Sequence, residues 1–292
     1  MGREFKSEPP SPRSVGDASG RYRTQLEHLG PAAAKLLERV PLQTGSPLPA
    51  NWLRTEMLER FQVLDQSPVA SGSKVLEIGA GPHAIATAPL AHRGGAHGRL
   101  VAVERERWAH FHEIMEATGM EGRVRPVRCD ARRLPFPPDT FDLAACIHGI
   151  RSLRAERIMV EVFREMLRVA PRLLLAESLP LARTDAQAAH LALYELRQEV
   201  FMAVTGRPDD LHYLSLQRLV ELVEEAGGSV MESSVIEVDL PHALALLPRS
   251  YIEQARDPEI RVDLIRRWDR AMALAQKHGT DHPPVGMVTA SR

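Results

Sequence analysis

Residues 74–86, KVLEIGAGPHAIA, are the part of this chain that says most about its architecture. An apolar strand, VLEI, breaks into the turn Gly79-Ala80-Gly81, after which a short helix begins. A strand, a glycine turn and a helix N-terminus together let backbone approach a nucleotide-like ligand closely. Glu77 stands just before the turn. Because a carboxylate repels phosphate, this loop suits a ligand that carries an ammonium or sulfonium charge.

The composition is that of a globular protein with a real core. The chain has 292 residues, of which 44% are hydrophobic and 26% charged, enough for one large domain with additions or two modest ones. The formal net charge is −1, so no global field attracts nucleic acid or an anionic membrane. No pattern in the chain specifies an oligomeric state.

The cysteines and the N-terminus indicate a cytoplasmic protein. Cys129 and Cys146 are the two cysteines, too few for a disulfide framework and without metal-ligand spacing. The N-terminal residues contain no apolar core of a signal peptide, and no stretch is long enough to span a bilayer. We therefore expect reduced thiols and no membrane contact.

Three regions follow one another along the chain. Residues 1–20 are rich in Ser, Pro, Gly and charge and are expected to be a disordered tail. Residues 21–70 carry helical patterns, including one over 50–64, and are expected to form an N-terminal helical lid. Residues 71–292 form the main domain, with helical additions at about 181–226 and 241–282.

Strands and helices alternate in the main domain. Apolar strands are predicted at 75–78, 100–104, 123–129, 142–147 and 172–177, with helices over 105–118 and around 158–169 between them. Alternation of this kind predicts an α/β fold, a doubly wound and mostly parallel sheet covered on both faces. Later strands at 230–240 and 284–290 bring the expected total to seven.

Three acidic residues stand at the ends of the first three strands. They are Glu77, Glu104 and Asp130. The carboxyl edge of an open parallel sheet is where ligands bind, and an acid after the second strand is placed to accept hydrogen bonds from ribose hydroxyls. Each acid alone is an ordinary loop residue. All three in register beside a glycine turn favour a binding site.

These motifs resemble those of the class I S-adenosylmethionine-dependent methyltransferases. The resemblance rests on Glu77-x-Gly79-x-Gly81, Glu104, Asp130-Ala131 with LPF, and the run DTFD at 139–142. It is strongest toward the small-molecule branch with quinone- and sterol-type enzymes, and it covers residues 72–180 well. It implies a Rossmann-like methyltransferase fold of seven strands in which the last strand is reversed.

The resemblance also implies a cofactor, S-adenosylmethionine, and roles for individual residues. The glycine turn would pass under its methionine part, and Glu77 would organise its ammonium end. The family has a third glycine where this chain has His83. The residues expected to bind the cofactor are Glu77, Gly79, Ala80, Gly81, His83, Glu104, Arg105, Asp130, Ala131 and Ile147.

The acceptor is expected to be a small, partly apolar molecule that lies near His148. His148 follows the fourth strand and is the first candidate for a proton acceptor, ahead of His83 and Glu177, although it could equally close the strand without a catalytic part. Tyr22, Tyr194 and Arg197 are expected to line the substrate pocket. No metal site is expected, since His110 and His112 do not share a helix face.

Three alternatives remain open from the sequence. Residues 79–84 also fit the dinucleotide pattern G-x-G-x-x-A, so an NAD-dependent oxidoreductase competes. A non-catalytic cofactor-binding or scaffold protein could keep this fold, with His83 as its support. A basic cluster over 123–133 admits an RNA or protein methyltransferase, although Arg side chains lying over apolar surface explain it better.

Overall fold

The computed structural model describes residues 52–105, 108, 110–153, 155–206, 213–242 and 249–292. The tail at 1–20, most of the expected lid and Tyr22 lie outside the described residues. Within that part of the chain, no helix combines the length and the apolar character that crossing a membrane requires.

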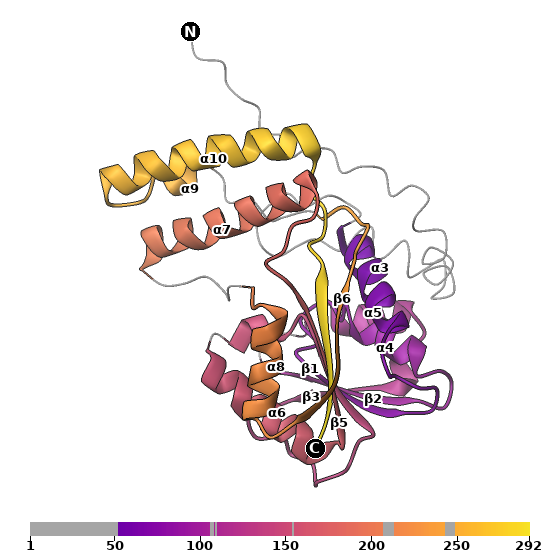
Figure 1. Cartoon of the computed structure of the whole chain (residues 1–292). Coiled ribbons are helices and arrows are strands. Elements are labelled where there is room, and N and C mark those ends of the chain that lie inside the picture. Colours follow the sequence, from indigo (N-terminus) through magenta and orange to yellow (C-terminus); the bar gives the residue numbers. More distant parts are fainter. Residues whose placement is uncertain (1–51, 106–107, 109, 154, 207–212, 243–248) are drawn as a thin grey trace.

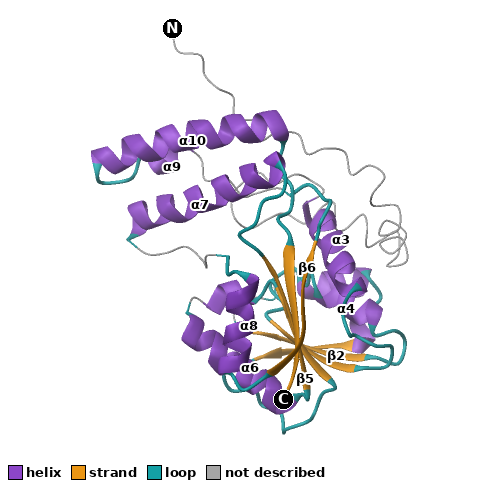
Figure 2. Ribbon diagram, viewed as in Figure 1, coloured by secondary structure: helices purple, strands orange, loops and turns teal. Residues whose placement is uncertain are grey.

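A seven-stranded sheet forms the centre of the molecule (Figures 1 and 2). Its order is β3-β2-β1-β4-β5-β7-β6. β7 runs antiparallel to both of its neighbours, β5 and β6, and the other neighbouring pairs are parallel. The predicted doubly wound, mostly parallel sheet with a reversed last strand is therefore confirmed. The strands are β1 (Lys74–Ile78), β2 (Arg99–Glu104), β3 (Val124–Arg128), β4 (Leu143–Ile147), β5 (Arg172–Ser178), β6 (Ser229–Ile236) and β7 (Val285–Ser291).

Helices cover both faces of the sheet because neighbouring residues of each strand point to opposite sides. In β1, Val75 belongs to the core shared with α3 (Trp52–Asp65), α4 (Thr87–Arg93) and α5 (Phe111–Ala117). Leu76 belongs to the core shared with α6 (Glu156–Val169) and α8 (Leu216–Glu225). The alternation places Glu77 on the α3–α4 side. Two 3-10 turns, Glu121–Arg123 and Ile150–Leu153, complete the loops around the sheet.

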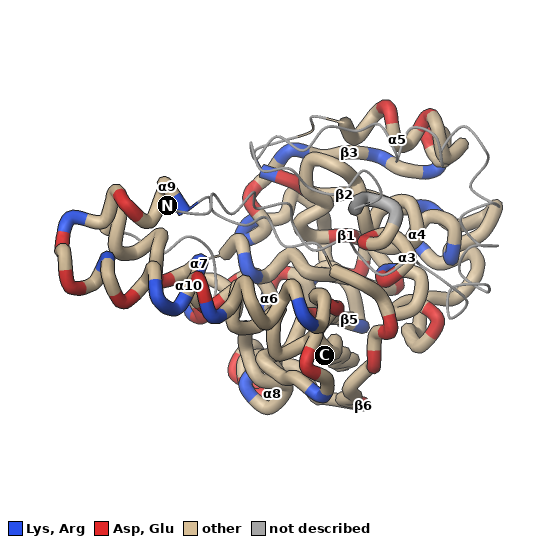
Figure 3. Tube along the Cα trace, turned by 90° about the horizontal axis from the view of Figure 1, so that it is seen from above, with Lys and Arg blue, Asp and Glu red and all other residues tan. Residues whose placement is uncertain are grey.

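Two long helices pack against each other beside this layered body (Figure 1). α7 (Asp185–Thr205) begins at Thr184, whose hydroxyl accepts a hydrogen bond from the Gln187 amide at 3.1 Å. α10 (Pro258–His278) begins at Asp257, which caps it in the same way. Together with the short α9 (Arg249–Ile252) they have an apolar core of their own. Figure 3 shows that acidic and basic residues are interspersed along them.

Two predicted elements are shorter than expected. The helix predicted over 105–118 begins only at Phe111, because the His110 amide donates to the Pro82 carbonyl (2.9 Å) instead of continuing a helix. The strand predicted over 230–240 ends at Ile236, opposite Val285. Its partner strand is preceded by Pro284, which has no N–H with which to extend the ladder.

Candidate functional site

The turn that follows β1 has a backbone conformation that residues other than glycine rarely adopt. Gly79 and Gly81 have φ angles of +77° and +67°, which glycine adopts without strain. The amides of Gly79 and Ala80 donate to the Val103 carbonyl at 2.9 and 3.2 Å, so β2 holds the turn. A Cβ built on Gly81 would meet no described atom within 4 Å. The turn therefore has an open side on which a ligand can lie against the backbone.

The other side of the turn packs against the loop after β4. A Cβ on Gly79 would lie 3.1 Å from the Gly149 Cα, and a Cβ on Gly149 would lie 2.9 Å from the Ile78 carbonyl oxygen and 2.8 Å from the Cys146 sulfur. The two loops therefore touch backbone to backbone. This contact brings the end of β4, with His148, next to the glycine turn.

Replacing Gly149 with alanine should disturb this contact. The added methyl group has no room against the Ile78 carbonyl, so we expect a loss of about 1–3 kcal/mol in the free energy of unfolding and weaker binding of S-adenosylhomocysteine. Urea denaturation and titration calorimetry measure both effects. Gly122→Ala is the matched control, since its Cβ would meet nothing within 4 Å. Equal behaviour of the two variants would contradict the tight approach of the loops.

Glu77 is a buried carboxyl group that makes no hydrogen bond to any described residue. It is 1% exposed and neither oxygen has a partner. Burial raises its pKa to about 8; the nearby Thr87 hydroxyl opposes the rise and the charge of Glu104 adds to it. An unsatisfied carboxyl group is costly in the interior. A cationic ligand group beside it would remove that cost.

Glu104 ends β2 at the mouth of the glycine turn. Its two carboxylate oxygens accept hydrogen bonds from the amides of Gly81 (3.1 Å) and Arg105 (2.7 Å). The predicted neighbours Gly81, Glu104 and Arg105 are thus brought together. A carboxylate has further lone pairs available for hydroxyl donors.

Asp130 and Ala131 follow β3, but Asp130 is engaged by its own loop. Its carboxylate pairs with the Arg132 guanidinium, with the closest contact at 2.6 Å, and accepts from the Arg132 amide at 2.9 Å. The Arg132 hydrogen bonds hold the pKa of Asp130 at about 2, and Arg105 contributes. Asp130 is therefore ionised and preoriented, and Ala131 packs beside it against the α6 core.

His83 packs against a second histidine. Its ring stacks on that of His110 at 5.4 Å, with 7° between the planes. Burial, together with the His110 ring, lowers the pKa of His83 to about 4. The imidazole is therefore neutral near pH 7. His83 stands where the methyltransferases that this sequence resembles have a third glycine. It adds a neutral ring at that position, not a positive charge.

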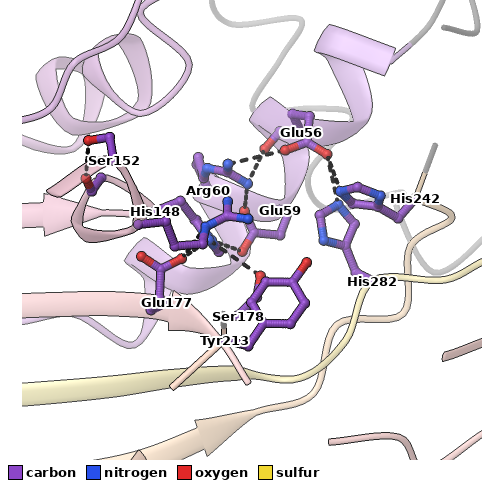
Figure 4. A network of polar contacts seen from close by, with 12 residues as sticks. Glu56, Glu59, Arg60, His148, Ser152, Glu177, Ser178, Tyr213, His242 and His282 are labelled. Carbon is purple, nitrogen blue, oxygen red and sulfur yellow. Dashed lines mark hydrogen bonds and ion pairs between the residues drawn. The ribbon is translucent and has the colours of Figure 1, made fainter. Parts of the chain in front are cut away.

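His148 stands at the centre of a buried charged network (Figure 4). It follows Ile147, the last residue of β4, with a φ of 53°, and its amide donates to the Ala176 carbonyl. Its Nδ1 lies 3.2 Å from Glu177 Oε1 and its Nε2 lies 3.0 Å from Glu59 Oε1. Burial and the Arg60 charge lower the pKa of His148, but the two carboxylates outweigh them and raise it above its usual value.

Half of this network comes from α3 and was not anticipated from the sequence. Glu56, Glu59 and Arg60 are each at most 5% exposed. Arg60 contacts both carboxylates, with Nη2 3.1 Å from Glu56 Oε2. The available signal was the spacing i, i+3, i+4, which puts the three residues on one helix face. Charged residues at such positions are ordinarily solvated, so this spacing alone does not indicate a buried network.

Aromatic and basic side chains close the network on the side of α7. Tyr194 is buried and stacks on Tyr213 with ring centroids 4.0 Å apart. The Arg151 guanidinium lies 5.4 Å from the centre of the Tyr213 ring and its Nε 2.9 Å from Glu177 Oε1. The structure thus brings Tyr194 toward His148. Arg197, one turn further along α7, is half-buried.

Comparisons with known proteins agree with this geometry. A family model described as a methyltransferase domain matches residues 75–173. The chain contains a methyltransferase domain of the class I S-adenosylmethionine-dependent type. Its methyl donor is S-adenosylmethionine, and nothing in the comparisons supports the dehydrogenase or the non-catalytic alternative.

Two relatives show which methyltransferases the chain is similar to. The ubiquinone/menaquinone biosynthesis C-methyltransferase UbiE of Idiomarina loihiensis is 27% identical over 177 residues, which are 60% of this chain and 70% of that protein. The demethylmenaquinone methyltransferase of Mycobacterium tuberculosis is 31% identical over 148 residues, 50% of this chain and 59% of that protein.

A solved structure shows that the fold is shared over most of this methyltransferase. The cyclopropane-fatty-acyl-phospholipid synthase-like protein from Lactobacillus casei superposes with a TM-score of 0.64. The match covers 85% of this chain and 95% of that protein at 15% sequence identity. At this identity the likeness concerns the fold, with its sheet order and its flanking helices.

Proposed function

We propose that this methyltransferase acts on a small, partly apolar molecule that carries an ionisable hydroxyl group, of the quinol type. The observation that carries the proposal is the buried histidine His148, set between the carboxylates of Glu59 and Glu177 beside the glycine turn. The printed names of the relatives, a quinone-pathway C-methyltransferase and a demethylmenaquinone methyltransferase, support the same class of acceptor.

The residues around the glycine turn fit S-adenosylmethionine. When bound, the cofactor supplies a methyl group activated by its sulfonium. The unpartnered Glu77 carboxyl group would hold the ammonium end of the cofactor, and the open face of Gly81 would leave room for its methionine part. Glu104 would accept hydrogen bonds from the ribose hydroxyls. Asp130 and Ala131 would face the adenine. Ala80, His83, Arg105 and Ile147 complete the proposed cofactor contacts.

His148 and its partners would handle the acceptor's proton. Two carboxylates raise the pKa of the imidazole, so its neutral form is a strong acceptor for a hydroxyl proton. Nε2 faces the Glu59 carboxylate at 3.0 Å. In the proposed step the acceptor's hydroxyl group would take the place of Glu59 and give its proton to Nε2, while the Nδ1–H stays on Glu177 and holds the ring in place. Removing the proton makes a quinol ring carbon or oxygen more nucleophilic. Tyr194 and Tyr213 would supply flat apolar surface for the ring.

A nucleic acid is a poor match for this site. In the basic segment 123–133, Arg132 is paired with Asp130 and Arg123 Nη1 donates to the Gly95 carbonyl at 2.7 Å. Both guanidinium groups are therefore occupied within the protein. The candidate site lies in a buried network rather than along a basic surface groove, which supports a small acceptor.

Turnover of purified protein with S-adenosylmethionine tests the proposal. We expect S-adenosylhomocysteine release with hydroquinones and naphthols but not with matched amines or thiols. His148→Gln should lower kcat/KM by about 10²–10⁴-fold, the usual contribution of a general base, and leave the Kd for S-adenosylhomocysteine within about twofold. His112→Gln, at an exposed histidine, is the control. Undiminished turnover in His148→Gln would rule out the proton-accepting role.

A further inference from the structure

Three side chains from distant parts of the chain converge beside the network (Figure 4). Glu56 comes from α3, His242 from the segment after β6, and His282 from the segment before β7. Glu56 Oε1 lies 3.2 Å from His242 Nε2 and 3.1 Å from His282 Nε2. One ligand atom from each of the three residues lies within 4.8 Å of the other two.

The two histidines are fixed by their backbones. An isolated antiparallel bridge joins Pro241 to Asp281. Around it, the His242 amide donates to the Thr280 carbonyl and the His282 amide to the Leu240 carbonyl, both at 2.9 Å. The His282 carbonyl accepts a further hydrogen bond from the Gln187 side chain at 2.9 Å. The backbone therefore holds the two imidazoles side by side.

The converging atoms are close but do not satisfy one another. His282 is 2% exposed, and neither of its ring nitrogens has a hydrogen-bond partner among the described residues. Glu56 Oε1 is unpartnered in the same sense. The atoms are near enough for hydrogen bonds but are not aligned for them. Two ligands about 2.0–2.1 Å from a tetrahedral zinc ion lie about 3.3 Å apart, which is close to the separations found here.

Neighbouring side chains contact Glu56 and His242 and fix their orientation. Arg60 holds Glu56 Oε2 at 3.1 Å and leaves Oε1 directed at the histidines. The His190 ring packs edge-on against His242, with centroids 4.5 Å apart, and its Nε2 lies 3.0 Å from the Tyr213 hydroxyl. The Arg60 contact with Glu56 is of the kind that orients carboxylate ligands in metal centres.

We propose that Glu56, His242 and His282 bind one divalent transition-metal ion of the zinc type. Two imidazoles and one carboxylate favour zinc, cobalt or nickel over magnesium and calcium, which prefer oxygen ligands alone. Three protein ligands leave a coordination position for water or a substrate atom, as in catalytic rather than structural zinc sites. The proposal does not depend on which acceptor the methyltransferase uses.

Metal content and cobalt spectroscopy of the tag-free, full-length protein test this site. After incubation with Zn²⁺ and desalting, mass spectrometry should find about one zinc per chain. Co²⁺ should give the intense visible absorption of a four-coordinate site, and Zn²⁺ should displace it. His242→Ala, His282→Ala and Glu56→Gln should each weaken zinc affinity at least about tenfold. His97→Ala, at an exposed histidine, should bind zinc like the wild type.

Each result decides the matter. Folded wild-type protein that takes up neither zinc nor cobalt would overturn the proposal, and so would folded triad variants that bind zinc as tightly as the wild type. Circular dichroism establishes folding. Should a triad variant fail to fold, the wild-type cobalt spectrum still tests the site, because exposed histidines do not give an intense four-coordinate signal.

Discussion

Replacing Glu77 with glutamine is expected to stabilise this methyltransferase above about pH 8 while weakening its binding of S-adenosylhomocysteine. Burial raises the pKa of Glu77 from its ordinary value of 4.5 to about 8. Between these values the folded protein keeps a proton that the unfolded chain has released, so the free energy of unfolding falls as pH rises through this window. The loss is at most about 5 kcal/mol, at about 1.4 kcal/mol per unit.

The glutamine variant has no such ionisation, so its stability should not fall with pH for this reason. It also lacks the negative charge that would hold the ligand's ammonium group, and a hydrogen bond between charged groups contributes about 1.5–3 kcal/mol. Binding should therefore weaken by about 10- to 150-fold. Thermal unfolding at pH 6 and pH 9, with calorimetry, measures both effects.

An exposed carboxylate provides the control for Glu77. Glu121→Gln, on the surface of a 3-10 turn, should change neither the pH dependence nor the affinity. If the stability of Glu77→Gln changes with pH by the same amount as that of the wild type, the Glu77 carboxyl group is not held in the buried, unpartnered state that the structure shows.

Replacing Arg60 with methionine is expected to be among the most destabilising single substitutions in the chain. Arg60 is 5% exposed and contacts the carboxylates of Glu56 and Glu59, which are 5% and 0% exposed. Removing one partner of a buried ion pair leaves charge without compensation and costs about 3–5 kcal/mol. Here one guanidinium serves two carboxylates, so the upper part of that range is expected.

Arg93→Met is the matched control for Arg60. Arg93 also pairs with an α3 carboxylate, that of Asp65 at 3.2 Å, but its side chain is 39% exposed. Exposed pairs contribute about 0–1 kcal/mol. Urea denaturation of both variants should show a large loss for Arg60→Met and a small one for Arg93→Met. Similar losses would mean that the α3 network does not contribute through its buried charges.

The sequence was sufficient for the fold because strand and helix patterns are local. Apolar runs and helical periodicity predicted the sheet and its flanking helices, and the three acids Glu77, Glu104 and Asp130 lie at the ends of neighbouring strands as expected. Ion pairing of Asp130 with Arg132 depends on loop geometry that the pattern does not specify. The start of α5 depends on a hydrogen bond from His110 to Pro82, which no periodicity contains.

The charged network could not be predicted because it is assembled over long sequence separations. A helical period places Met57, Phe61 and Leu64 on one apolar face, and all three are buried. It gave no reason to bury Glu56, Glu59 and Arg60, since such residues are almost never buried unless they are paired. Their partners, His148, His242 and His282, lie far along the chain. Only the folded arrangement brings these groups together.

The hydrogen bond between His148 and Glu59 also bears on which part of the chain is needed for catalysis. The family model covers residues 75–173, which suggests a portable catalytic module. Yet the partner of His148 Nε2 lies on α3, ahead of that module, and Tyr194 and Tyr213 lie behind it. A protein cut at the module's borders, or a chimera that grafts it elsewhere, would keep His148 and lose the groups that set its basicity. The working unit is therefore defined by charge compensation rather than by sequence similarity, and it extends across the helix before the sheet and the helices after β5.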